Sequence, residues 1–104
     1  MDKNGYNPSL LQEDHEVCYF WPCLDCVPGK LDRHEIFGGA LRAKSKRYGL
    51  WVSICHNGCH LGPQGVHASR SKREALQRMA QLRAMEVYGW SEEDFRREFY
   101  KSYL

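Results

Sequence analysis

The sequence predicts a small α+β domain, and three observations lead to that prediction. Short segments rich in strand-forming side chains occur between residues 17 and 54. Two helical segments with recognisable capping residues follow between residues 69 and 104. Cysteine pairs flank the strand segments, and the core of a 104-residue chain is small enough to need such a staple. We therefore expect a stapled β core followed by a C-terminal helical pair.

The strand candidates are separated by turn-forming residues. Residues 17–21 favour a strand and end at a proline, and residues 31–37 form a second candidate. The glycine pair at 38–39 interrupts that candidate, and residues 40–47 tolerate a short helix. Residues 50–54, Leu-Trp-Val-Ser-Ile, are the strongest candidate because a glycine precedes a run of β-favouring side chains. The predicted order is therefore strand, loop, strand, and then helices.

The first long helix is expected over residues 72–88. Ser69 or Ser71 can cap it, and Glu74 completes a capping box with Ser71. Gly89 is a natural stop because glycine adopts the left-handed conformation that often ends a helix. The expected apolar side of this helix consists of Leu76, Met79, Leu82 and Met85.

A second, shorter helix is expected after Gly89. Ser91 caps it, and Asp94 stands at the capping-box position three residues later. Its apolar face consists of Phe95, Phe99 and Tyr103. Residues 69–104 thus form a helical unit attached to a core at residues 17–68, and together they make a single domain over residues 17–104.

Composition narrows the setting in which the domain works. Residues 1–16 are polar, with little periodicity, and are expected to form a flexible tail. The chain has no apolar run that would serve as a secretory signal or a membrane span, so a cytoplasmic setting is expected. Cysteine pairs in the cytoplasm favour a metal ion over a disulfide. The formal net charge of +2 by itself indicates no nucleic-acid partner.

Four of the five cysteines have the spacing of a structural zinc site. Cys23 and Cys26 form a C-x2-C half-site, and Cys55 and Cys59 supply the second half. The interval between the halves is long enough to hold a strand, a loop and another strand. Cys18 is either a core thiol or a replacement for one of the four.

A basic strip runs through residues 33–47, where Glu35 is the single acidic residue. Such a strip is either a solvated surface or a site for the backbone of a polyanion such as DNA. Its basic residues are Arg33, Arg42, Lys44, Lys46 and Arg47.

Histidines cluster around the cysteine pairs. His34 and Glu35 stand on the second strand candidate, His60 follows Cys59, and His67 comes shortly before the helical unit. His15 and His56 are expected to be surface or hydrogen-bonded residues. Imidazole and carboxylate groups are the usual ligands and proton acceptors in catalytic metal sites. The three grouped histidines and Glu35 are therefore the candidate catalytic residues.

The set of motifs resembles the HNH nucleases, and among them the small phage-encoded HNH proteins and the related Ref-type recombination-enhancement nucleases. The resemblance covers roughly residues 18–104. It is carried by residues 33–39, Arg42, Ser45, residues 48–50, Cys55, Cys59, His60, residues 65–67, residues 88–90, Phe95, Tyr103 and Leu104. It implies a zinc-stapled ββα-metal fold, also called a His-Me finger, in a DNA endonuclease of a bacterial host cell.

The resemblance also implies roles for individual residues. His34, His60 and His67 would bind a catalytic divalent ion such as Mg, Mn, Ni or Zn, while His34, Glu35 and His60 would take part in catalysis. The chain departs from the family pattern at the dipeptide His34-Glu35, which is usually Asp-His or His-His. In a strict register His34 is the ligand and Glu35 the general base; in a shifted register His34 is the base and Asp32 joins the ligands.

A second departure keeps other functions open. Gly49 and Leu50 stand roughly where the family has an asparagine, and Asn57 fits a turn better than that role. The alternative to an endonuclease is a zinc-stabilised DNA-binding module, or a recombination or packaging accessory that cleaves only with a partner protein. The sequence does not determine the oligomeric state.

Overall fold

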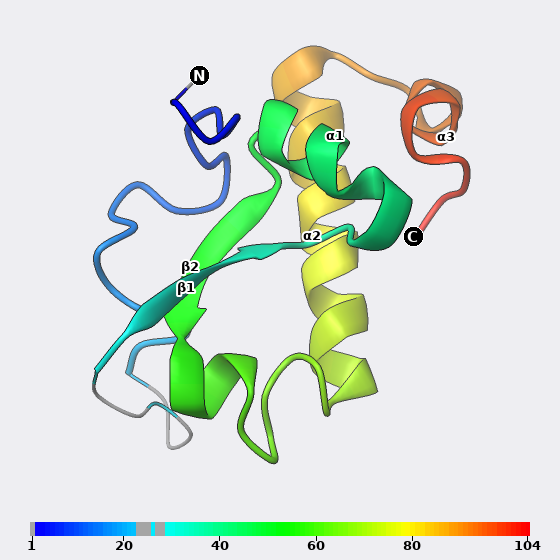
Figure 1. Cartoon of the computed structure of the whole chain (residues 1–104). Helices are drawn as coiled ribbons and strands as arrows, with labels where there is room; N and C mark the ends of the chain where they lie inside the picture. Colours follow the sequence, from blue (N-terminus) through cyan, green and yellow to red (C-terminus); the bar gives the residue numbers. More distant parts are fainter. Residues whose placement is uncertain (1, 23–25, 27–28) are drawn as a thin grey trace.

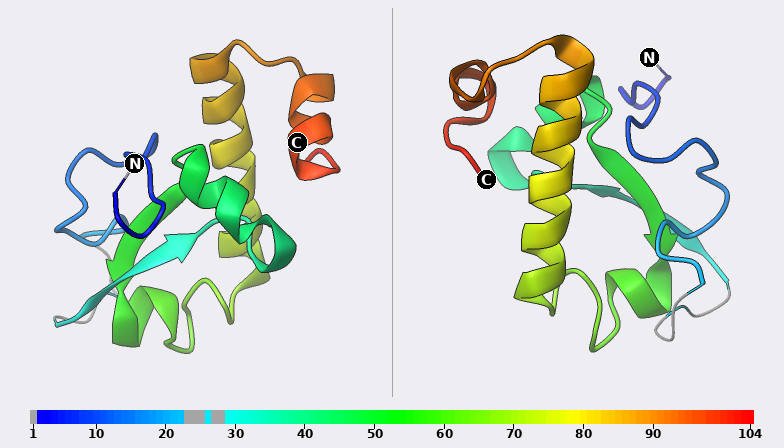
Figure 2. Two further views of the ribbon diagram at one scale, coloured as in Figure 1. Left: turned by 45° about the horizontal axis from the view of Figure 1, so that its top comes forward. Right: turned by 180° about the vertical axis from the view of Figure 1, so that it is seen from behind.

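A small two-stranded sheet is the centre of the fold. The computed structural model describes residues 2–22, 26 and 29–104. Strands β1 (Leu31–Glu35) and β2 (Trp51–Cys55) are antiparallel, with Leu31 opposite Cys55 and Glu35 opposite Trp51. Every residue of β2 is buried, because helix α2 lies along one side of the sheet and the N-terminal segment along the other (Figures 1 and 2). The predicted α+β class is confirmed, and so are the strands predicted at 31–37 and 50–54, within two residues at their ends.

Two short helices connect the strands. The 3-10 helix η1 (Gly39–Leu41) leads directly into α1 (Arg42–Arg47), where a short helix is expected. Buried Ser45 anchors α1 to the end of β1: its hydroxyl donates to the carbonyl of Phe37 at 2.7 Å and accepts from the Phe37 amide at 3.0 Å. These bonds satisfy the backbone of a buried residue, which would otherwise cost free energy.

The segment after β2 is a π-helical turn, η2 (His56–His60). The Cys55 thiol stands at its N-terminus and accepts a hydrogen bond from the Cys59 amide at 3.0 Å. Turns of this kind occur frequently at functional sites. Here the turn places a buried cysteine, Cys59, next to a half-buried histidine, His60.

Helix α2 (Arg70–Tyr88) begins at Ser69, whose hydroxyl accepts from the Lys72 amide, and ends at Gly89 with φ 67°. The predicted stop is confirmed, and Ser69 rather than Ser71 is the cap. The predicted apolar side is wrong at two positions: Met79 and Leu82 are 46% and 49% exposed. The buried row is Leu76, Ala80, Gln81 and Ala84. Its small alanines allow the helix backbone to approach the core closely, which turns the larger side chains of the neighbouring row to the surface.

Helix α3 (Glu92–Phe99) has the predicted capping box between Ser91 and Asp94. Its buried rings, Phe95 and Phe99, stack 4.7 Å apart and pack against Phe37. Buried Gln81 of α2 then fixes the C-terminus, because its side-chain oxygen accepts from the Tyr103 amide at 2.6 Å. The helical pair therefore closes the core from the side of α1 (Figure 1).

The N-terminal segment differs from expectation in two ways. Residues 17–21 lie within the described part of the chain and form no strand; the Tyr19 amide donates to the carbonyl of Ser53 at the sheet edge. Residues 2–16 are expected to form a flexible tail, but they bond to the domain through the hydroxyl of Ser9, which donates to the carbonyl of Trp51, and the amide of Leu10. In the part of the chain that the structure describes, no helix has the length and apolar character of a membrane span.

Candidate functional site

Four cysteines come together at one end of the sheet. Cys18, Cys26, Cys55 and Cys59 place their sulfur atoms within 4.8 Å of one another. The Cys26 sulfur lies 3.7 Å from that of Cys18 and 3.6 Å from that of Cys59. Zinc–sulfur bonds of about 2.3 Å at tetrahedral angles place sulfurs about 3.8 Å apart, so the group has the dimensions of a zinc site. The four cysteines could therefore hold an ion such as zinc.

Among the described residues, the group contains three of the four predicted cysteines together with Cys18. The sequence predicts Cys23, Cys26, Cys55 and Cys59, and the structure brings the last three together with Cys18. Cys23 lies outside the described residues. Cys18 belongs to no short cysteine motif, so the spacing that indicated the other ligands gave no signal for it. Its 7% exposure fits either a core thiol or a ligand.

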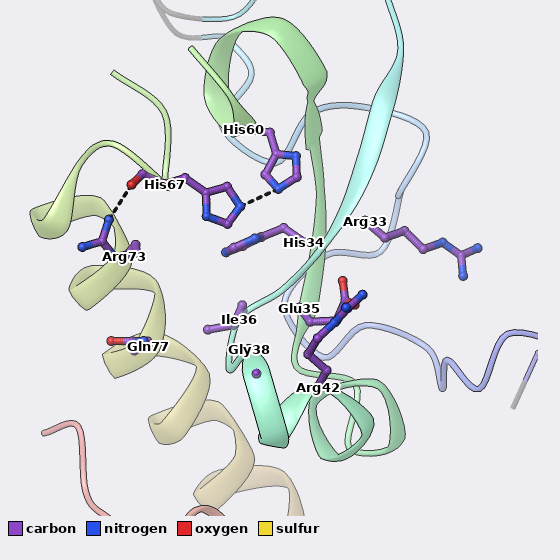
Figure 3. Close-up of a pocket in the computed structure, with 11 residues that line it drawn as sticks. Arg33, His34, Glu35, Ile36, Gly38, Arg42, His60, His67, Arg73 and Gln77 are labelled. Carbon is purple, nitrogen blue, oxygen red and sulfur yellow. Dashed lines mark hydrogen bonds and ion pairs between the residues drawn. The ribbon is translucent and has the colours of Figure 1, made fainter. Parts of the chain in front are cut away.

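Three imidazoles converge beside the sheet (Figure 3). His34 comes from β1, His60 from the end of η2, and His67 from the loop before α2. The Nε2 atoms of His60 and His67 lie 2.9 Å apart. The centre of the His34 ring lies 5.4 Å from the centre of the His60 ring and 5.3 Å from that of the His67 ring. One ring nitrogen from each histidine lies within 4.8 Å of the others, so the predicted grouping of these three residues is present.

The electrostatics keep two members of this cluster, His34 and His67, in the form that a metal ion requires. Burial, together with the nearby His60 and His67, lowers the pKa of His34 to about 4, while Glu35 has the opposite effect. Burial also lowers the pKa of His67. At neutral pH both groups are therefore uncharged, and a neutral imidazole has the lone pair that binds a metal.

A second hydrogen-bonded group lies next to the imidazoles. One carboxylate oxygen of Asp32, Oδ2, lies 2.7 Å from Nδ1 of His60 and 2.5 Å from Nδ1 of His56. Burial opposes ionisation of Asp32, but the hydrogen bonds from the two histidines outweigh it and lower the pKa of the carboxyl group. His56 is thus a hydrogen-bonded residue, as expected, and Asp32 contacts the histidine cluster only through His60.

A cavity of about 500 Å³ opens beside the histidine cluster. Glu35 lies in its wall and accepts two hydrogen bonds from Arg42, at 3.1 Å from Nε and 2.8 Å from Nη2, both on Oε1. Arg73 of α2 lies on the opposite wall and donates to the carbonyl of His67 at 2.8 Å (Figure 3). The sequence contains no signal for Arg73, because it lies in a helix outside the basic strip and belongs to no recognised motif.

The residues of the basic strip border two hollows: one is the cavity beside the histidines, and the other is lined by Arg42, Lys44, Lys46 and Arg47. Arg42 and Arg33 both line the histidine cavity, and the Arg33 guanidinium points away from His34 and pairs with Asp2 at 2.7 Å (Figure 3). Lys44 donates to the carbonyl of Glu98 at 2.6 Å and so joins α1 to α3. Lys46 lies over the ring of Tyr6 and Arg47 over that of Tyr48. The strip therefore remains a candidate surface for a polyanion, and Arg42 is the member that borders both hollows.

Comparison of the chain with family models, with curated proteins and with solved structures finds no match. The functional argument therefore depends on the geometry of the site and on its chemistry.

Proposed function

We propose that this protein is a metal-dependent endonuclease of the HNH type that hydrolyses phosphodiester bonds of DNA. The observation that carries the proposal is the convergence of His34, His60 and His67 from three separate segments of the chain. A zinc-stapled binding module has no need for three imidazoles whose ring nitrogens converge. A metal-dependent hydrolase needs a group of metal ligands of this kind beside its substrate cavity.

The donor set fits a divalent ion of borderline softness. Imidazole nitrogens suit Zn, Ni and related ions better than Mg, which prefers oxygen ligands. Metal–nitrogen bonds of about 2.1 Å place neighbouring ligands about 3.0 to 3.4 Å apart. The 2.9 Å between the Nε2 atoms of His60 and His67 is close to the lower value. A bound divalent cation would stabilise the negative charge that develops on the phosphate and on the leaving oxygen.

Glu35 is the proposed general base. Since His34 groups with His60 and His67 as a ligand, Glu35 is the remaining proton acceptor of the predicted dipeptide. Both Arg42 hydrogen bonds go to Oε1, so Arg42 anchors the carboxylate at that oxygen without occupying Oε2. A carboxylate held in this way can accept a proton from an attacking water.

Arg42 and Arg73 are the proposed phosphate-binding residues. They line opposite walls of the cavity that contains the imidazoles (Figure 3). Guanidinium groups bind phosphate oxygens through directed, charge-assisted hydrogen bonds. Contacts of this type position the nucleic-acid backbone without reading its sequence. We therefore expect little sequence preference from these two residues.

A second candidate is a zinc-stabilised DNA-binding module that does not cleave by itself. The Arg42–Glu35 ion pair favours it, because the pair neutralises the carboxylate that the nuclease needs as a base. An accessory protein that requires a recombination or packaging partner belongs to the same class. Both would bind DNA and leave it intact when tested alone.

Plasmid nicking by the purified protein separates the candidates. Supercoiled DNA is incubated with Mg, Mn, Ni or no added metal, and the His34→Ala and His60→Ala variants run beside the wild type. His15→Ala is the matched control, because His15 packs against Trp51 away from the cluster. The nuclease predicts metal-dependent nicking that both cluster variants lose and the control keeps. Retardation of DNA on a gel without nicking under any metal would favour the binding module.

A further inference from the structure

Asp32 lies between the two histidines of η2, His56 and His60. It does not belong to the group formed by His34, His60 and His67. It lies on β1 two residues before His34, so the two side chains share one face of the strand. Its Oδ2 faces both Nδ1 atoms, 2.7 Å from His60 and 2.5 Å from His56. Its other oxygen, Oδ1, lies 3.7 Å from the Lys30 ammonium. The carboxylate is thus surrounded by donors.

We propose that Asp32 is a positioning residue for His60: it holds the Nδ1–H of that imidazole and so directs the Nε2 lone pair to the metal site. The inference rests on the metal site of the proposed function. The two ring nitrogens of His60 face different partners, Asp32 at Nδ1 and His67 at Nε2. A neutral imidazole has one N–H and one lone pair, so the carboxylate at Nδ1 determines which nitrogen is the ligand.

The same three residues could also be read as a second ion site, because Asp32, His56 and His60 lie within ligand range of one another. Two distances oppose that reading. Ligands of one ion with bonds of about 2.1 Å lie about 3.0 Å apart or more. The 2.5 and 2.7 Å separations are shorter and are ordinary lengths for a charge-assisted hydrogen bond. Asp32 is therefore a hydrogen-bond acceptor here rather than a ligand.

His56 provides a matched control because it bonds to the same oxygen of Asp32 and to no atom of the imidazole cluster. Removing His56 leaves the Asp32–His60 bond in place. Removing the negative charge of Asp32 in Asp32→Asn leaves an amide of equal size, which can donate to His60 Nδ1 and so favour the wrong tautomer. Outer-sphere partners of metal-bound histidines typically change metal affinity by roughly 10- to 100-fold.

The test combines two measurements on protein loaded with one equivalent of zinc. Long-range ¹H–¹⁵N NMR at about pH 8, above the ordinary histidine pKa, reads the His60 tautomer without nickel. Calorimetric titration with Ni²⁺ then gives the affinity of the histidine site. We expect the Nδ1–H tautomer in the wild type and roughly 10- to 100-fold weaker nickel binding in Asp32→Asn. His56→Ala should bind nickel like the wild type.

Three results would overturn the inference, and they differ from one another. If His60 in the wild type is the Nε2–H tautomer, this result by itself contradicts the proposed role of Asp32. Equal loss of nickel in Asp32→Asn and His56→Ala would place the ion among Asp32, His56 and His60. A wild type that binds no nickel at all would contradict the proposed metal site itself, and the role of Asp32 with it.

Discussion

Cys59 and His60 are consecutive residues of η2, and their side chains belong to two different groups of metal-ligand residues. Cys59 joins Cys18, Cys26 and Cys55, whereas His60 joins His34 and His67. The Cys59 amide also bonds to the Cys55 sulfur, so the turn is held from the cysteine side. The position of His60 therefore depends on the integrity of the cysteine group.

Loss of the cysteine group should unfold the protein. We expect Cys26→Ser, Cys59→Ser and Cys18→Ser to lose bound zinc and to melt at a much lower temperature, because binding of a structural zinc contributes about 10 kcal/mol or more to folding. Zinc content by mass spectrometry and thermal melts by circular dichroism measure both effects. Cys23→Ser is the informative comparison: the four grouped cysteines are enough for a tetrahedral site, so we expect this variant to retain zinc. Melting of Cys18→Ser like the wild type would show that Cys18 is a core thiol.

Arg73 should contribute to cleavage, although it lies outside the basic strip. Its guanidinium bonds to the carbonyls of Val66 and His67 and faces the cavity. Arg73→Ala should lower the nicking rate about 100-fold, because it displaces His67 and removes a phosphate contact. Arg78→Ala, an exposed arginine of the same helix, is the control and should nick at the wild-type rate. Equal rates for the two variants would exclude this role for Arg73.

The buried His34 should make the zinc-loaded protein sensitive to acid. Its pKa is about 4 in the folded chain against an ordinary value of 6.5, so between these values the unfolded state binds a proton that the folded state does not. The contribution of His34 to the free energy of unfolding is therefore fully present above about pH 6.5. Between about pH 6.5 and pH 4 it falls by about 1.4 kcal/mol per pH unit. Urea unfolding without a second metal measures it, with His34→Gln as the reference that lacks this titration. Parallel pH curves for the two proteins would contradict the assignment.

The C-terminus depends on one buried amide. Gln81 accepts from the Tyr103 amide at 2.6 Å and donates to the Ser102 hydroxyl at 3.0 Å. Gln81→Leu should lower the free energy of unfolding by about 1 to 3 kcal/mol, because it leaves the Tyr103 amide without that acceptor. Leu82→Ala, at the adjacent but exposed position, should cost less than about 0.5 kcal/mol. Denaturant unfolding compares them, and a larger loss for Leu82→Ala would show that the outer face of α2 is covered in solution.

The elements with strong local signals were predictable from sequence. Residues 50–54 combine β-branched and aromatic side chains after a glycine, and β2 forms there. Gly89 and the Ser91–Asp94 box end one helix and start the next because their preferences are local. The grouping of His34, His60 and His67 was also expected, from their positions around the cysteine pairs and from the family resemblance.

The remaining features depend on tertiary contacts that no short motif encodes. Cys18 joins the cysteine group from a segment without regular structure, and Asp32 reaches His56 and His60 only because η2 folds back over β1. Lys44, one of the predicted DNA-binding residues, also joins α1 to α3 by donating to the carbonyl of Glu98, and no motif indicates that contact. Such pairings follow from how segments distant in the chain pack together.

Nickel anomalous scattering from a crystal soaked in Ni²⁺ tests the central claim most directly, because it locates the ion without any assumption about activity. The account predicts a peak about 2.1 Å from one ring nitrogen each of His34, His60 and His67. It also predicts that the peak disappears in His34→Ala while the zinc at the cysteines stays. A nickel peak among Asp32, His56 and His60, or none outside the cysteines, would contradict the proposed catalytic centre.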